Sequence, residues 1–118
     1  MEDIKVKIGG KEYDYRAPDY ATRYEMLLAV NENQIRGSAA ILGCCLPGLV
    51  SAGYEAHHCN AMRFGAYVWE QILPLIEDDI EIVRLAMPIR MALLRAAFPA
   101  ETEERTDFFS PSEATSTP

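Results

Sequence analysis

The sequence predicts a mainly helical α+β fold, in which an N-terminal β-hairpin is followed by about four helices. Three observations predict it: apolar residues alternate around a Gly-Gly pair near the N-terminus, apolar residues then recur at helical spacing, and the last twenty residues are polar and acidic. A length of 118 residues suits one domain with one core. We therefore expect a helical domain over residues 1–98 and a disordered acidic tail over residues 99–118.

The N-terminal segment has the pattern of a β-hairpin. Ile4, Val6 and Ile8 alternate with charged residues, which places the apolar side chains on one face of a strand. Gly9-Gly10 follows, and glycines reach the positive φ of a two-residue hairpin turn without steric cost. The segment KEYDYR then returns as the second strand. An isolated two-stranded hairpin is marginally stable, so we expect it to pack on the helices or to pair with another chain.

Capping residues mark the first two helices. Asp19 is a good N-cap for a helix that runs to about Val30, and Asn33 is a good N-cap for the segment QIRGSAAILGCC. This second helix contains Gly37 and Gly43, and a glycine inside a helix costs about 1 kcal/mol relative to alanine. The two glycines therefore predict that another backbone approaches closely. In the first helix, one face is shared by the large apolar residues Tyr20, Tyr24, Leu27 and Leu28.

Two longer helices are expected in the second half of the chain. One runs over about residues 55–73 and ends near Pro74, and the other runs over about residues 79–97. Pro88 is expected to bend the last helix, because proline removes a helical hydrogen bond. The acidic run EDDIE stands at its start, where the positive end of the helix dipole favours carboxylates.

Charge and composition argue against several classes of partner. A net charge of −7 without a cluster of Lys and Arg opposes binding to nucleic acid or to an anionic membrane surface. The longest apolar run, residues 39–50, is interrupted by Pro47-Gly48 and is too short to span a bilayer. The chain shows no N-terminal signal pattern, and an odd number of cysteines does not suggest a disulfide framework. We expect a cytoplasmic protein, in the host cytoplasm if the chain is viral.

All the cysteines and histidines lie in one segment, CCLPGLVSAGYEAHHC, from Cys44 to Cys59. Zinc sites use spaced ligand pairs, whereas Cys44-Cys45 and His57-His58-Cys59 are contiguous. A nucleophilic cysteine would need an oxyanion-binding motif, and none accompanies it. We therefore expect buried thiols and histidines at a helix start, with no catalytic residue, metal or cofactor. A metal or thiol sensor built on this segment is an alternative.

The last helix carries the widest apolar surface in the sequence. One stripe consists of Ile80, Val83, Met87, Met91, Leu94 and Phe98. A second stripe consists of Ile82, Leu85, Ile89, Leu93 and Ala96. Such a band fits a central core helix or a binding surface, and methionine suits a surface that accommodates varied shapes. The expected partner-binding residues are Leu85, Met87, Met91 and Leu94, together with Phe108 and Phe109 of the tail.

The hairpin VKIGGKEYDYRAP, a helix beginning DYATRYEMLL, three further helices and an acidic tail follow one another along the chain. This order of parts resembles that of the tail assembly chaperones of long-tailed bacteriophages. The resemblance implies a non-enzymatic protein that coats the hydrophobic, helical tape-measure protein until tail-tube subunits replace it.

The combined expectation is a small chaperone or scaffold of virion assembly that forms homo-oligomers through its helices. Its expected partners are the tape-measure and tail-tube proteins, and the hairpin is expected to contact other subunits or the tube. The alternative from another class is a cytoplasmic adaptor or inhibitor domain, which acts through the FFSP motif at residues 108–111.

Overall fold

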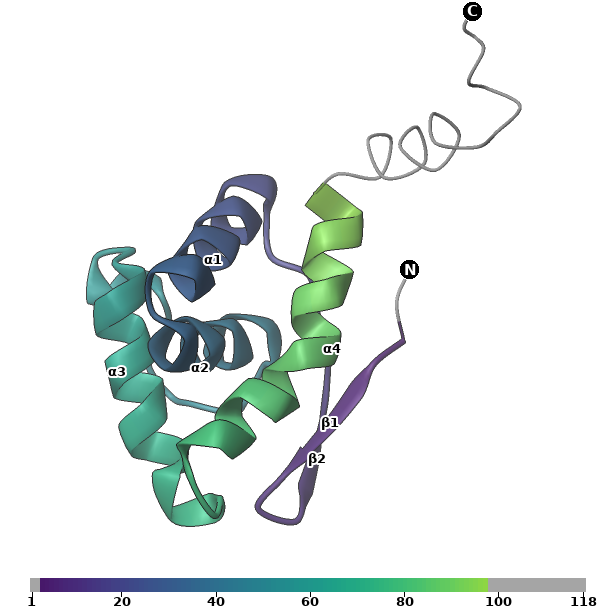
Figure 1. Cartoon of the computed structure of the whole chain (residues 1–118), viewed down its shortest axis with the longest axis vertical. Helices are drawn as coiled ribbons and strands as arrows, with labels where there is room; N and C mark the ends of the chain where they lie inside the picture. The colour runs from purple at the N-terminus through teal and green to yellow at the C-terminus, as the bar shows by residue number, and fades with distance from the viewer. Residues whose placement is uncertain (1–2, 98–118) are drawn as a thin grey trace, which may run out of the picture.

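The computed structural model describes residues 3–97 and confirms the predicted fold class over this range (Figure 1). Strands β1 (Lys5–Ile8) and β2 (Lys11–Asp14) form an antiparallel hairpin. The α-helices are α1 (Tyr20–Glu32), α2 (Gln34–Cys45), α3 (Ala61–Ile72) and α4 (Asp79–Ala97). The short 3₁₀ helices η1 (Glu55–His57) and η2 (Leu73–Leu75) stand on either side of α3. The predicted tail, residues 99–118, lies outside the described residues.

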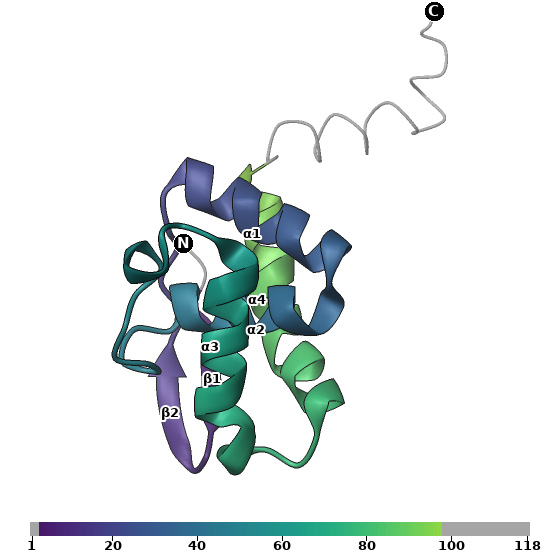
Figure 2. The ribbon, with the colours of Figure 1, turned by 90° about the vertical axis from the view of Figure 1, so that its left-hand side faces the viewer.

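The hairpin has the predicted turn. Gly9 and Gly10 have φ values of 62° and 83°, which only a glycine pair adopts easily. Val6 and Ile8 are 4% and 2% exposed, so the apolar face of β1 is buried against the helical domain. Figure 2 shows β2 at the rim of the molecule. The hairpin therefore packs on the helices, as expected.

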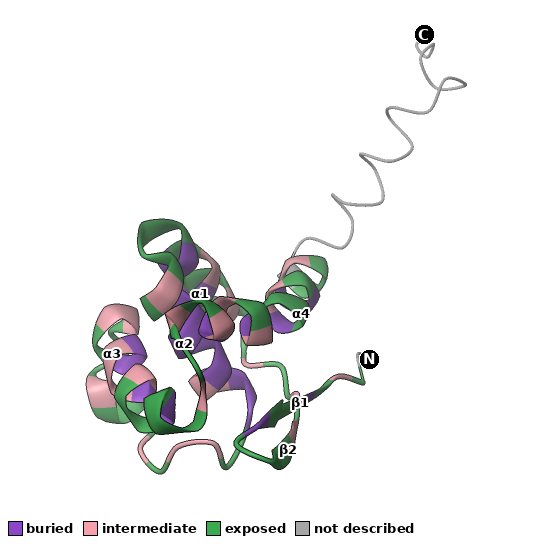
Figure 3. Cartoon of the chain, turned by 60° about the horizontal axis from the view of Figure 1, so that its bottom comes forward, coloured by how far each residue is buried: buried purple, intermediate pink, exposed green. Residues whose placement is uncertain are grey.

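Helix α2 lies at the centre of the domain and packs against α1, α3 and α4. Its residues 37–42 are all buried, so this helix is covered on every side (Figure 3). A Cβ atom on Gly37 would lie 2.5 Å from the Cα atom of Val30, which confirms the predicted close backbone approach. Gly43 instead faces side chains, because its Cβ would lie 2.5 Å from Cγ2 of Val68.

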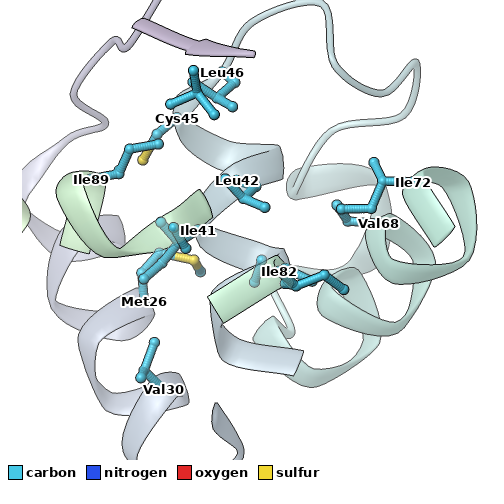
Figure 4. Close-up of a cluster of buried hydrophobic side chains, with 14 of the residues drawn as sticks. Met26, Val30, Ile41, Leu42, Cys45, Leu46, Val68, Ile72, Ile82 and Ile89 are labelled. Atoms are coloured by element: carbon cyan, nitrogen blue, oxygen red, sulfur yellow. The ribbon is translucent and has the colours of Figure 1, made fainter. Parts of the chain in front are cut away.

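The closest contact between helices joins α2 to α3. A Cβ atom on Gly65 would lie 2.9 Å from the carbonyl carbon of Arg36, and side chains almost never approach a backbone so closely. Large apolar side chains fill the space around this contact (Figure 4). Those that are fully buried include Met26, Ile41, Leu42, Leu46, Phe64, Val68, Ile82, Ile89 and Leu93.

Side-chain caps begin α1, α2 and α3. Asp19 accepts a hydrogen bond from the backbone N–H of Thr22 at 2.8 Å, which also lowers the pKa of its carboxyl group. Asn33 accepts from the N–H of Arg36 at 3.0 Å in the same way, so both predicted N-caps are confirmed. The cap of α3 is Asn60, which the sequence reasoning did not identify.

The predicted start of the third helix near Glu55 is wrong. Residues 55–57 form η1, and α3 begins only at Ala61. His58 and Cys59 have φ values of 57° and 52°, and this left-handed backbone ends the 3₁₀ turn before α3 can begin. Asn60 then accepts from the N–H of Arg63 at 3.0 Å and caps α3. Non-glycine residues rarely adopt this conformation, so the break could not be predicted from His58 and Cys59.

The apolar residues of α1 and α4 divide between the core and solvent. In α1 the buried residues are Met26, Ala29 and Val30, whereas Tyr20, Tyr24 and Leu28 of the predicted apolar face are exposed. In α4 the second predicted stripe faces inward through Ile82, Ile89 and Leu93. Figure 1 shows α4 changing direction about halfway along, where Pro88 interrupts its hydrogen bonds.

The contact at Gly65 predicts a sharp difference between two glycine substitutions. Gly65→Ala should destabilise the domain by about 1–3 kcal/mol, because the new methyl group forces α2 and α3 apart. Gly53→Ala is the matched control, since its Cβ would have open space around it, and it should change stability by less than about 1 kcal/mol. Urea unfolding followed by circular dichroism measures both. Equal losses of stability would contradict this assignment.

Candidate functional site

Three large apolar residues on one side of α4 face solvent. Ile80 is 57% exposed, Met87 39% and Met91 44%, and their spacing of seven and four residues aligns them along the helix. These three residues are called the α4 face. The opposite side of the helix buries Ile82, Ala86, Ile89, Ala92 and Leu93. Helix α4 therefore supplies part of the core and also presents an apolar surface.

The predicted partner-binding residues occupy different places in the structure. Met87 and Met91 belong to the α4 face, and Leu94 is half-buried beside it. Leu85 is half-buried and packs against the core on another side of the helix. Phe108 and Phe109 lie outside the described residues. The structure thus brings the two methionines together and sets Leu85 apart from them.

Polar groups border the α4 face. Arg84 is exposed and lies three residues before Met87, which places it on the same side of the helix. Pro88 has no N–H, so the carbonyl group of Arg84 cannot receive its usual helical hydrogen bond. Arg84 therefore places a charged residue between Ile80 and Met87 on this side of the helix.

A second exposed apolar row runs along α1. Tyr20 is 58% exposed, Tyr24 46% and Leu28 50%, and they follow one another at four-residue spacing. Leu28 borders an open groove between α1 and α3, to which Glu25 and Met62 also contribute. The sequence pattern grouped these residues on one face without showing that this face meets solvent.

The cysteines of the segment from Cys44 to Cys59 lie in three different environments. Cys45 is buried, Cys44 is half-buried and Cys59 is exposed. Burial raises the pKa of the Cys44 thiol to about 12 and raises the pKa of Cys45 as well, so both stay protonated at neutral pH. Among residues 3–97, no three His, Cys, Asp or Glu side chains lie close enough together to hold a metal ion.

The histidines of this segment do not start a helix, so that prediction is wrong. The ring of His57 lies 4.6 Å from the ring of Tyr67 and 5.5 Å from that of Phe64. Its Nδ1 atom lies 3.1 Å from the carbonyl oxygen of Gly53. His57 thus packs the loop onto α3, while His58 occupies the left-handed position that ends η1.

Tyr54 ties the same loop to α1. Its hydroxyl oxygen lies 2.6 Å from Oε1 of Glu25 and 2.8 Å from the carbonyl oxygen of Cys59. The hydroxyl group has one proton and two acceptors within reach. Burial and the hydrogen bond to Glu25 raise the pKa of Tyr54, so the phenol stays neutral and remains a donor.

The acidic run at residues 77–81 organises the start of α4. The N–H of Glu81 donates to Oδ1 of Asp78 at 3.1 Å, and the N–H of Glu77 donates to Oε1 of Glu81 at 2.8 Å. Asp79 accepts from Nε1 of Trp69 at 2.8 Å, which joins α3 to α4. These carboxylates therefore cap and anchor the helix, as the sequence predicted for a helix start.

No family model, no curated protein and no solved structure matches this chain. Within the described range, no helix has both the length and the apolar character needed to cross a membrane.

The three thiols should react at very different rates. In the native chain at pH 8, Ellman's reagent should modify Cys59 rapidly and Cys45 only after unfolding, because burial excludes the reagent and keeps the Cys45 thiol protonated. Cys44 should react slowly, since its raised pKa leaves little thiolate at that pH. Absorbance at 412 nm measures the release of thionitrobenzoate, and a Cys59→Ser control should remove the fast phase. Rapid modification of all three thiols would contradict the described burial.

Proposed function

We propose that this chain is a non-enzymatic binding protein that holds an apolar helical segment of a partner against the α4 face. The observation that carries the proposal is the exposure of Ile80, Met87 and Met91 on one side of a helix whose other side fills the core. Large apolar side chains aligned on a surface are typical of protein-binding sites. Their alignment along one helix suits a partner that is itself a helix.

The dimensions of the α4 face suit a short amphipathic helix. From Ile80 to Met91 the helix advances by about 16 Å, which is three turns. An apolar partner helix would present its anchors at helical spacings of three, four and seven residues. Methionine side chains have three rotatable bonds and adapt to different shapes, so the surface suits a partner whose sequence varies along its length.

The specific role that we propose is that of a phage tail assembly chaperone in the host cytoplasm. The order of the hairpin and the helices supports it, as does an apolar face on a strongly acidic chain. In this role the partner is the long, hydrophobic tape-measure protein, which tail-tube subunits later take over. A net charge of −7 keeps such a protein soluble while it covers apolar segments. Several copies would cover one long partner, so the proposal includes a homo-oligomer.

Charged substitutions on the α4 face test the proposal. We expect Met87→Glu with Met91→Glu to abolish binding, because two carboxylates would be buried without partners against an apolar helix. The measurement is co-expression with a long, hydrophobic helical tape-measure protein, the partner that this role requires, followed by recovery of that partner in the soluble fraction. Both methionines are exposed, so the variant should keep the wild-type melting temperature.

The chain offers a matched control in Leu28, which is also a large exposed apolar residue on another helix. Leu28→Glu should keep the partner soluble, since it adds the same kind of charge away from the α4 face. Removal of residues 100–118 should also leave binding intact, whereas the adaptor alternative requires its loss. Equal loss of the partner with Leu28→Glu, or retention with the methionine variant, would refute the assignment of the α4 face.

A further inference from the structure

We infer that the acidic tail of this chain, residues 99–118, folds back onto the α4 face of the same molecule. The Phe108-Phe109 pair then packs against Met87 and Met91. The tail and a partner helix compete for one surface, so the contact is autoinhibitory. As a regulation of binding at the α4 face, it rests on the proposed function.

The exposed side of α4 carries positive charge as well as apolar side chains. Arg84 is exposed and precedes Met87 by three residues. Arg95 is exposed and follows Met91 by four residues, so both arginines share the side of the helix that the methionines occupy. After Glu81, every charged residue of α4 is an arginine, whereas the whole chain has a net charge of −7. An acidic segment is therefore attracted to this side of α4.

The tail has the complementary charge and two aromatic anchors. It contains five acidic residues and one arginine, which gives it a net charge of −4. Four of the acidic residues precede the Phe108-Phe109 pair, so they pass Arg95 when the pair reaches the methionines. The fifth, Glu113, follows the pair and comes within reach of Arg84. Methionine thioether groups make favourable contacts with aromatic rings, so the tail matches both the charge and the apolar groups of the surface.

The length of the chain allows this contact within one molecule. Helix α4 ends at Ala97, and Figure 1 shows this end at the periphery of the helical domain. Along the helix axis, Met91 lies about 9 Å and Met87 about 15 Å back from this end. Phe108 stands eleven residues after Ala97, and a stretch of that length reaches up to about 36 Å when it is extended. The tail is therefore long enough to reverse direction and bring its aromatic pair to both methionines.

The exposed apolar row on α1 lacks this charge match. Leu28 borders the groove between α1 and α3, and the exposed residues Glu25 and Glu32 line the same groove. Their carboxylates repel an acidic segment. A tail that carries both acidic residues and apolar anchors therefore selects the α4 face over the α1 row.

Methyl NMR of the full-length chain, labelled at its methionine methyl groups, tests the contact directly. The methyl signals of Met87 and Met91 should differ between the wild-type chain and the variant Phe108→Ala, Phe109→Ala, because aromatic ring currents shift the signals of groups packed against them. Met26 is fully buried in the core, so its signal should be the same in both chains and serves as the internal control. Unchanged signals of Met87 and Met91 would overturn the inference.

Dilution distinguishes a contact within one molecule from a contact between copies. The shift differences at Met87 and Met91 should not depend on protein concentration. Differences that disappear on dilution would assign the tail to the α4 face of a second copy and would overturn the inference.

A charge reversal tests the role of the arginines. In the Arg84→Glu background, the shift differences caused by the two phenylalanines should decrease, because the new carboxylate repels the tail. Arg63→Glu is the matched control, since Arg63 is an exposed arginine on α3, and it should leave the differences unchanged. Differences that persist in full with Arg84→Glu would overturn the charge selection of this face.

Titration with a synthetic amphipathic helix that has an apolar face and no net charge separates this inference from the proposed function. The variant Phe108→Ala, Phe109→Ala should bind the peptide more tightly than the wild-type chain. If the tail covers the α4 face for about nine-tenths of the time, the affinity should rise by about tenfold. Equal affinities would overturn the autoinhibition and leave the proposed function standing. Absence of binding by both chains would overturn the proposed function and the competition that rests on it, whereas the methionine signals report the tail contact independently.

Discussion

The close approach of α2 to its neighbours is the contact on which the rest of the domain depends. Gly37 meets the backbone of α1 and Gly65 meets the backbone of α2, so three helices lie nearer to one another than ordinary side chains would allow. A helix buried on every side needs a small residue wherever another backbone passes, and α2 has Gly37 at such a place and buries the small residues Ala39 and Ala40 nearby. Dispersion forces and apolar burial then act over the whole surface of one short helix.

This packing also explains why several large apolar side chains are exposed to solvent. The central helix α2 has a small surface area. Only one side of α1 and one side of α4 can therefore pack against it. In α4 that side includes Ala86 and Ala92, which allow close packing, and the long side chains of Met87 and Met91 are left on the solvent side. The α1 row has the same origin, since Ala29 and Val30 face α2 while the tyrosines point away. A domain of this size thus exposes large apolar residues as a consequence of how its centre is built.

Much of the fold could be predicted because the residues that specify each turn or helix start lie close together in the sequence. The Gly9-Gly10 turn, the caps at Asp19 and Asn33 and the start of α4 each depend on residues within a few positions of one another. The start of α3 was missed because two non-glycine residues adopt left-handed backbone there, held in place by contacts of Tyr54 and His57 with distant residues. The solvent-facing sides of α1 and α4 were ambiguous for a related reason. Each helix has more apolar residues than it can bury, and only the tertiary arrangement decides which of them face α2.

The hydrogen bond between Trp69 and Asp79 has a further consequence for observing the molecule. Trp69 is the only tryptophan in the chain, and its half-buried indole touches the first residue of α4. Its fluorescence is therefore a single-site optical signal from the corner between α3 and α4. A nearby carboxylate and partial burial both influence indole emission. A motion of α4 relative to α3 therefore changes the emission wavelength or the quantum yield of Trp69. The molecule carries its own spectroscopic probe at the base of the helix that presents the α4 face.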